Sequence, residues 1–224
     1  MLLAACSTTV TGTASVALRS DPPTAVRPLD EVLPAAWEIS AALGIGQDGY
    51  LGQLVEGGAD TLLAGVDQSE ATPIECVSAT YRLQRVVYAA SPVRTVVTRS
   101  WAGGGPDGPS STAFIGVVKL ASADDARAFF AATADKWRAC DGRTMVLYQA
   151  DRAMRASTRI TDVTVGDRVV SAVLVHDPVT GAASVGRALG VGSDCIVDVE
   201  VTGGQASGGA IDIAGLMLHK VTGF

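Results

Sequence analysis

Five strand-like segments follow one another between residues 144 and 201, and no helical pattern separates them. They cover residues 144–149, 159–165, 168–175, 182–189 and 195–201. Gly166-Asp167, between the second and the third, has the composition of a two-residue hairpin turn. Strands in hairpin succession are typical of an antiparallel sheet, which is what the sequence predicts here.

The last of these segments alternates in polarity. One set of alternate positions holds Ile196, Asp198 and Glu200, and the other holds Val197, Val199 and Val201. Successive side chains of a strand point to opposite faces of the sheet. We therefore expect one face of this strand to contact water.

The clearest predicted helix runs from Ser122 to Cys140. Ser122 and Asp125 have the spacing of a capping pair, with Asp in place of the usual Glu. Residues of one face recur at helical spacing, at Ala126, Phe130, Thr133, Trp137 and Cys140. Cys140 is therefore expected at the end of the helix on its core face, where a cysteine can join the helix to another element.

Two more helices are predicted near the ends of the chain. The first covers residues 34–43 and ends at Gly44, which can adopt a left-handed cap conformation. The other begins at Ser207 and ends near Thr222, with an apolar side made of Ile211, Ala214, Leu218 and Val221. Extended segments are predicted before the middle helix at residues 81–88, 93–101 and 113–120. Together these patterns predict an α+β fold, with a twisted antiparallel sheet of hairpin-connected strands and flanking helices at the start, middle and C-terminus.

The first six residues end in a motif that is typical of bacterial lipoproteins. Leu3-Ala4-Ala5-Cys6 has the apolar and small residues of a lipobox, whose cysteine receives a diacylglycerol before the peptide is cut in front of it. The following tract is rich in Ser and Thr and then in Pro, which suits a flexible tether. We expect residues 1–5 to be a signal-peptide remnant, residues 1–30 to form the lipobox and tether, and Cys6 to anchor the chain on the extracytoplasmic face of the cell membrane. A cytosolic protein with a chance cysteine is the alternative.

Composition narrows the classes of partner. The chain of 224 residues has a net charge of −6 and no basic cluster, so we do not expect it to bind nucleic acid. No later apolar stretch approaches the roughly 18–20 residues that span a bilayer, so membrane attachment is expected through the lipid. No His/Cys spacing indicates zinc and no Asp-rich loop indicates calcium, and we therefore expect no metal and no cofactor.

The sequence contains no recognisable catalytic motif. Neither histidine, His176 or His219, lies near a Gly-x-Ser-x-Gly or cysteine nucleophile motif. The segment 44–49 matches Gly-x-Gly-x-x-Gly, but it follows a helix instead of a strand, so we interpret it as a helix cap and turn. We expect no enzyme activity, with a hydrolase built from distant residues as the least favoured alternative. Trp101 and Tyr148 border strands and loops and are candidates to line a ligand cleft, although packing in the core or at a rim is the simpler role.

Three cysteines remain after Cys6, namely Cys76, Cys140 and Cys195. They can form one disulfide and leave one thiol, and three pairings are possible. An extracytoplasmic setting favours a disulfide. Three buried reduced thiols are the alternative.

Several segments together resemble a known family. The most distinctive is Trp137-Arg138-Ala139-Cys140, at the end of the predicted middle helix. The others are Leu33-Pro34-Ala35-Ala36 through Ala42-Leu43-Gly44, Cys76, Val87-Tyr88-Ala89, and Arg187-Ala188-Leu189 running to Ile196-Val197-Asp198-Val199. With these segments, most of residues 30–224 resembles the extracellular sensor domain of the mycobacterial serine/threonine kinase H and its stand-alone lipoprotein relatives. Residues 31–224 are accordingly expected to form a single sensor domain of this kind.

The resemblance carries expectations about disulfides and function. It implies a disulfide between Cys76 and Cys140, which agrees with the place of Cys140 on the helix. The family's second disulfide falls near Val185 and Val201 here, so this chain is not expected to form it, and Cys195 is left as a buried residue or a free thiol. The resemblance also implies a ligand cleft between sheet and helices. We therefore expect a lipid-anchored, ligand-binding or sensor-type domain without catalytic activity, which binds an unknown small molecule. An envelope scaffold or adaptor that binds another protein is the second hypothesis.

Overall fold

The computed structural model describes residues 28–46, 49–67, 69–104, 111–149, 154–176 and 184–222. Its strands are β1 (Tyr50–Leu51), β2 (Val55–Gly57), β3 (Ala71–Thr72), β4 (Val93–Gly103), β5 (Ser111–Leu120), β6 (Thr144–Gln149), β7 (Met154–Val165), β8 (Val169–His176), β9 (Val185–Gly192) and β10 (Cys195–Thr202). Its helices are α1 (Ala36–Ala42), α2 (Val77–Thr80), α3 (Arg85–Tyr88), α4 (Ala123–Cys140) and α5 (Ala206–Thr222), with short 3-10 turns η1 (Leu29–Val32), η2 (Ala59–Thr61) and η3 (Ile74–Cys76).

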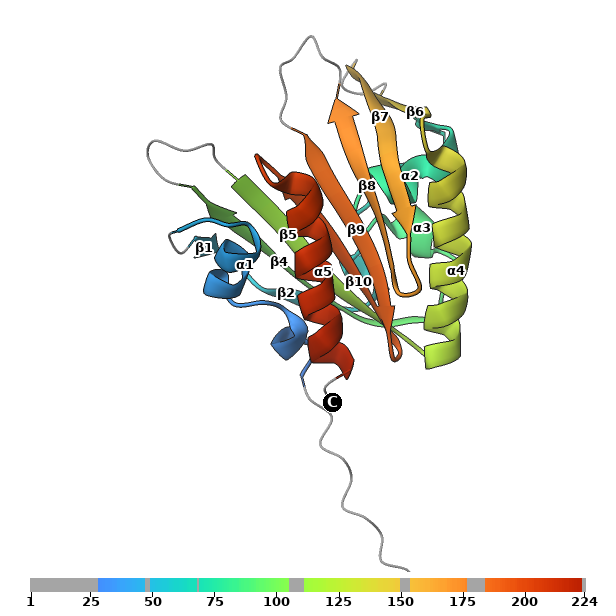
Figure 1. Cartoon of the computed structure of the whole chain (residues 1–224). Helices are drawn as coiled ribbons and strands as arrows, with labels where there is room; N and C mark the ends of the chain where they lie inside the picture. The colour runs from blue at the N-terminus through green and yellow to red at the C-terminus, as the bar shows by residue number, and fades with distance from the viewer. Residues whose placement is uncertain are drawn as a thin grey trace, which may run out of the picture.

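Within these residues the strands form one open, ten-stranded antiparallel sheet (Figure 1). The strand order is β1-β4-β5-β10-β9-β8-β7-β6-β3, and β2 also pairs with β4. Helices lie at the start, in the middle and at the C-terminus of the described chain. The predicted α+β fold with an antiparallel sheet is confirmed.

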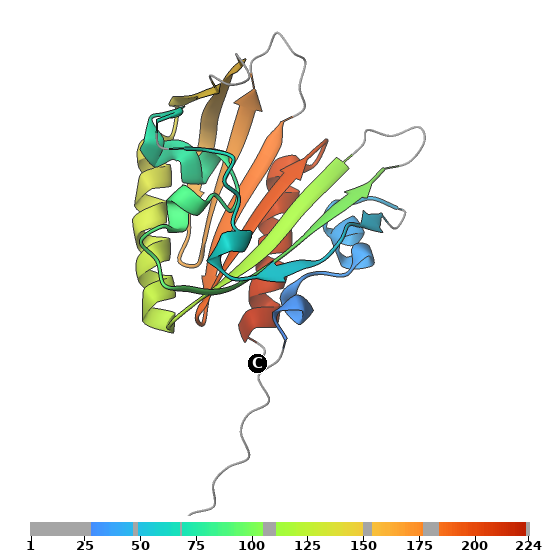
Figure 2. The ribbon, with the colours of Figure 1, turned by 180° about the vertical axis from the view of Figure 1, so that it is seen from behind.

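Helices cover both faces of the sheet. α5 packs on β8, β9 and β10, with α1 beside it, whereas α4, α2 and α3 lie on the opposite face (Figures 1 and 2). The central strand β10 serves both layers because its side chains alternate: Val197 joins the hydrophobic cluster under α5, and Ile196 joins the cluster under α4. The prediction that one face of this strand contacts water is wrong, because both of its faces are covered. Asp198 is only 2% exposed.

Local signals specify α4 well. Ser122 caps the helix: its Oγ accepts a hydrogen bond from the Asp125 backbone N–H (3.1 Å) and donates one to the Asp125 carboxylate (2.6 Å). All five residues of the predicted core face, Ala126, Phe130, Thr133, Trp137 and Cys140, are buried. The predicted cap after α1 is also confirmed, since Gly44 has φ +65° and Ile45 donates its N–H to the Ser40 carbonyl.

Three local predictions need correction. Residues 81–88 are not a strand; a turn leads into the short helix α3, from which Tyr88 stacks on Phe129 of α4 with 4.6 Å between ring centroids. Packing against α4 therefore overrides the β propensity of this segment. The turn between β7 and β8 has two residues but lies one position later than predicted: Gly166 donates its N–H to the Val169 carbonyl at 2.8 Å, so Asp167 and Arg168 are at its centre. Ile211 is 42% exposed, because the buried face of α5 is set by Ala210, Ile213, Ala214 and Met217.

Candidate functional site

A tight turn before α3 is fastened to the face of the sheet opposite α5. Leu83, at the centre of this turn, has φ +50° and lies against Gly116 of β5, where an added Cβ would come within 2.7 Å of its side chain. The Leu83 N–H donates to Asp198 Oδ2 of β10 at 2.8 Å. Next to it, Arg82 stacks on Phe114 and forms an ion pair with Glu200. The sheet therefore offers a glycine as the seat of the turn and carboxylates that hold it in place.

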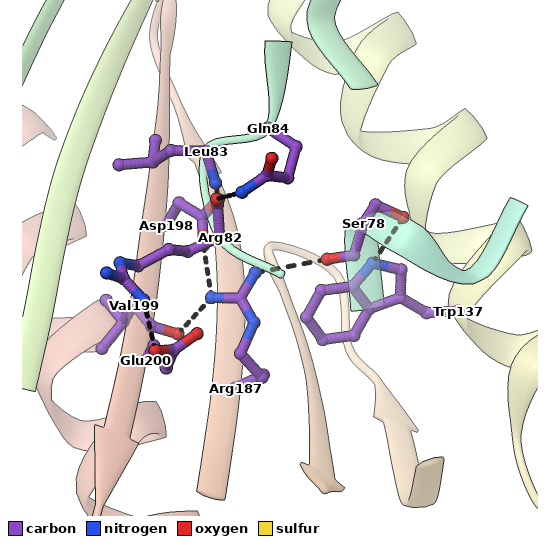
Figure 3. A network of polar contacts seen from close by, with 9 residues as sticks. All are labelled: Ser78, Arg82, Leu83, Gln84, Trp137, Arg187, Asp198, Val199 and Glu200. Carbon is purple, nitrogen blue, oxygen red and sulfur yellow. Dashed lines mark hydrogen bonds and ion pairs between the residues drawn. The ribbon is translucent and has the colours of Figure 1, made fainter. Parts of the chain in front are cut away.

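Asp198 also belongs to a buried ion pair with Arg187 of the neighbouring strand β9 (Figure 3). Arg187 Nη1 donates to Asp198 Oδ1 at 2.7 Å and to the Val199 carbonyl at 2.9 Å, and its side chain is 0% exposed. Its other amino group donates to the carbonyl of Ser78 at 3.2 Å. The Ser78 hydroxyl accepts from Trp137 Nε1 of α4 at 3.1 Å, so the network joins the sheet to α2 and α4.

Burial and the neighbouring charges together set the protonation states of Arg187 and Tyr88 in this network. Burial alone would lower the pKa of Arg187, but the negative charges of Asp198 and Glu200 outweigh it, so the pKa is raised and the guanidinium stays charged. Burial, and then the charge of Asp198, raises the pKa of Tyr88 well above its ordinary value and keeps the phenol neutral. The small void beside Tyr88 and Asp198 has no room for a water-sized molecule. This cluster therefore acts as a clamp between elements, and a ligand has to bind elsewhere.

A larger hollow lies between α4 and two hairpin turns, and we call it the α4 groove. Its volume is about 530 Å³. α4 contributes Arg127, Phe130, Ala131, Ala134, Asp135 and Arg138. The turn between β7 and β8 contributes Val165, Asp167 and Arg168, and the turn between β9 and β10 contributes Val191 and Ser193. The groove thus combines an apolar floor with three arginines, and its volume lies within the roughly 300–1,000 Å³ of small-molecule sites.

The three arginines are held in two different ways. Arg127 and Arg138 each pair with an aspartate one turn earlier on α4, Asp124 and Asp135, and all four side chains are largely exposed. Exposed pairs of this kind hold their members weakly. Arg168 instead donates its Nε–H to the backbone carbonyl of Val191 at 3.2 Å, which fixes its guanidinium to the far wall of the groove. The site can therefore present guanidinium donors to an anion while the floor contacts an apolar group.

A second, smaller hollow lies beside the turn at Arg82. Its volume is about 220 Å³, and Gln53, Thr61, Thr98 and Ser100 give it a polar lining. Arg82 is already engaged by Phe114 and Glu200. We call it the Arg82 hollow. Arg99 lines it as well, so its smaller volume alone makes it the weaker candidate for a ligand site.

The two residues expected to line a cleft do not come together. Trp101 is 1% exposed and packs in the cluster under α5, and Tyr148 is 55% exposed on β6. Five strands separate β4 from β6 in the sheet. Neither residue is among the described lining of the α4 groove or the Arg82 hollow, so their role in a cleft stays a prediction. Cys6 lies outside the described residues.

Comparison with known proteins identifies the family. A model of the PknH-like extracellular domain matches residues 24–220. The chain belongs to this family. It is therefore an extracytoplasmic sensor-type domain.

A solved relative shares the fold of this PknH-like domain. The extracellular domain of PknH from Mycobacterium tuberculosis matches with a TM-score of 0.71 and 24% identity, over 86% of this chain and 93% of that one. An uncharacterised protein from Mycobacterium smegmatis matches with a TM-score of 0.41 and 9% identity, over 84% of this chain and 95% of that one, which is too remote to support an argument. The search of curated proteins found no match. In the part of the chain that the structure describes, no helix is long and apolar enough to cross a membrane.

The PknH-like domain contains the disulfide that the resemblance implied. Cys76 and Cys140 are joined, with 5.7 Å between their Cα atoms. The bond links the end of η3 to the last residue of α4, next to the Trp137–Ser78 hydrogen bond. The disulfide and the buried network therefore both hold the end of α4 against η3 and α2.

Cys195 is a free thiol at the start of β10, and we expect it to be unreactive in the native protein. It is 4% exposed, and burial together with the nearby charge of Asp194 raises its pKa to about 12. Its thiolate fraction at pH 8 is then more than roughly a thousandfold below that of an exposed cysteine. Iodoacetamide at pH 8 should leave this thiol unmodified in the folded chain and label it in urea, as read by peptide mass spectrometry. Rapid labelling of the folded chain would contradict the burial of Cys195.

The spacing of two arginines on the predicted middle helix is a sequence signal for the groove. Arg127 and Arg138 are eleven residues apart, which places them on the same side of a helix after three turns. This pattern marks a basic stripe on the predicted middle helix. Arg168 could not have been found in this way, because only the pairing of β7 with β8 brings its turn to α4.

Proposed function

We propose that this chain is a lipid-anchored, non-catalytic domain that binds a small molecule in the α4 groove. The observation that carries the proposal is the groove itself, where an apolar floor under α4 meets three arginines from two separate elements. A concave apolar surface with a few convergent polar groups is the usual form of a ligand site. The clamp around Asp198 supports this role, because it fixes one end of α4 to the sheet through Trp137.

The chemistry of the groove supports binding over catalysis. Among its described lining residues, Ser193 supplies a hydroxyl, and no histidine accompanies it. His176 hydrogen-bonds with Thr158 (3.1 Å), and His219 lies in the last turn of α5. A nucleophile needs a base within hydrogen-bonding reach, and neither histidine lines the groove.

Anchoring through Cys6 rests on the lipobox and agrees with an extracytoplasmic family. The protein expressed from its own gene in its native cells should fractionate with the membrane, and its N-terminal peptide should begin at a diacylated Cys6. Cys6→Ser should release the chain from the membrane fraction. An unmodified N-terminus on a chain found in the cytosol would contradict the anchor.

Ligand binding is tested on protein taken from its own membrane. Native mass spectrometry of the wild-type chain should show a bound small molecule. Ala131→Trp should deplete it at least about tenfold, because the indole fills the groove from an exposed position on α4. Ala132→Trp is the matched control, since Ala132 is also exposed but does not line the groove. Equal ligand content in both variants, or no ligand in the wild type, would overturn the proposal.

A further inference from the structure

The shape of the α4 groove suits an elongated ligand. Its lining along α4 runs from Arg127 to Arg138, which corresponds to about 16 Å of helix. Phe130 and Ala134 lie between the two arginines, and Val165 and Val191 face them from the turns. A ligand that matches this surface has a long apolar part, because a small ion would leave the floor in contact with water.

The charges of the groove suit a single negative group. Guanidinium groups bind carboxylate and phosphate oxygens through paired hydrogen bonds, and Arg168 is already oriented by its bond to the Val191 carbonyl. Acidic side chains lie among the arginines, at Asp135 and Asp167 in the lining and at Asp124 beside Arg127. They would repel a multiply charged head, so the balance favours a monoanion.

One end of the α4 groove lies at the end of the domain where the described chain begins. The β9–β10 turn and the first turn of α4 lie at the same end of the molecule as η1, the first described element (Figures 1 and 2). If the chain is anchored at Cys6, this end is the one connected to the membrane. A lipid could then pass from the bilayer into the groove without crossing the domain.

From these three observations we infer that the α4 groove binds one molecule of a monoanionic, single-chain lipid. Its chain lies on the floor around Phe130 and Ala134, and its head contacts Arg168. This inference rests on the proposed function, because it names the class of ligand for the same groove.

The test uses the full chain as Cys6→Ser, delipidated, and titrated calorimetrically below the micelle concentration of each probe. Dodecanoate, a monoanion at pH 7, should bind with a stoichiometry of one, at least about tenfold tighter than dodecylphosphocholine, whose head has no net charge. Inorganic phosphate should give no measurable binding at the same concentrations. Preference for the phosphocholine head, or equal binding of inorganic phosphate, would overturn the inference.

Single substitutions distinguish recognition of the lipid's head group from recognition of its alkyl chain. Arg168→Ala should weaken dodecanoate about tenfold and dodecylphosphocholine much less, because the choline cation offsets the attraction of the phosphocholine phosphate to the guanidinium. Arg159→Ala, which removes an exposed arginine of β7 outside the groove, is the control and should change neither. Ala131→Trp should abolish binding of both probes, and Ala132→Trp should not.

The same variants distinguish a groove from a charged surface. Adsorption to anionic vesicles that is unaffected by Arg168→Ala and Ala131→Trp, without binding of the monomeric probes, would overturn the inference. If a neutral or multiply charged molecule co-purifies with the native chain and is lost in Ala131→Trp, the proposed function stands and only the lipid class is wrong. If Ala131→Trp affects no ligand at all, both proposals fail.

Discussion

Asp198→Ala is expected to lower the free energy of unfolding by about 3–5 kcal/mol, as is usual when one partner of a buried ion pair is removed. Arg187 would remain charged and 0% exposed without its carboxylate. The Leu83 N–H would lose its acceptor at the same time, so the turn before α3 would be released from the sheet. Urea unfolding at pH 7, followed by circular dichroism, measures the loss.

A double replacement shows whether the cost comes from the unpaired charge. Arg187→Met combined with Asp198→Leu should recover a large part of the lost stability, because no charge stays buried. Glu75→Ala is the control: it removes an ion pair with Arg143 that is about half exposed, and it should barely move the urea midpoint. A cost below about 1 kcal/mol for Asp198→Ala would contradict the clamp.

Removal of the disulfide by Cys76→Ala with Cys140→Ala should cost about 4 kcal/mol in the chain-entropy model. The sequence separation of 64 residues makes the closed loop long, and both cysteines are fully buried where η3 meets the end of α4. Thermal and urea unfolding of the double variant measure the effect. Wild-type protein unfolded in the presence of a reductant should show a similar loss.

Cys195→Ala provides the control for the disulfide. It replaces a buried, unpaired thiol and should cost about 1 kcal/mol, with the response to reductant unchanged. Stability of the double variant equal to that of the wild type would show that the 76–140 bond does not limit unfolding. The same conclusion would follow if a reductant changed nothing.

Regular elements with strong periodicity were predictable from the sequence. α4 was predicted with its cap at Ser122 and its five buried positions, and β6, β8 and β10 were predicted close to their observed bounds. β7 begins five residues earlier than predicted, and β9 is shifted by three residues. The segment 81–88 was not, because its conformation depends on Asp198, which is 115 positions from Leu83 in sequence. No local propensity can report a contact at that distance.

The segments that carry the family resemblance indicated more of the buried residues than composition did. The segments that carry it include Tyr88, Trp137, Arg187 and Asp198, and the structure brings all four to the buried clamp. Alternation in β10 alone suggested water beside Asp198, because a charged residue in a strand usually marks an exposed face. Only the partner strand β9, with Arg187 opposite Glu200, reveals that the charge is buried and paired.

The α4 groove could not be predicted from the sequence, because its two walls meet only in the tertiary structure. Its wall on α4 belongs to a helix that the sequence predicts. The opposite wall is formed by two hairpin turns that the sequence places 27 to 66 positions away (Val165 from Arg138, and Ser193 from Arg127). Trp101 and Tyr148 were selected because they border strands and loops. The sheet order separates them, since β4 and β6 lie near opposite edges.

Hydrogen–deuterium exchange of the full chain, with and without its native ligand, tests the central claim most directly. If the α4 groove is the ligand site, the ligand should slow amide exchange in residues 127–138 of α4 and in the turn at residues 166–168. Exchange around the Arg82 hollow, in residues 53–63 and 98–100, should stay the same. Protection confined to the Arg82 hollow, or no protection in α4 while ligand is bound, would contradict the account.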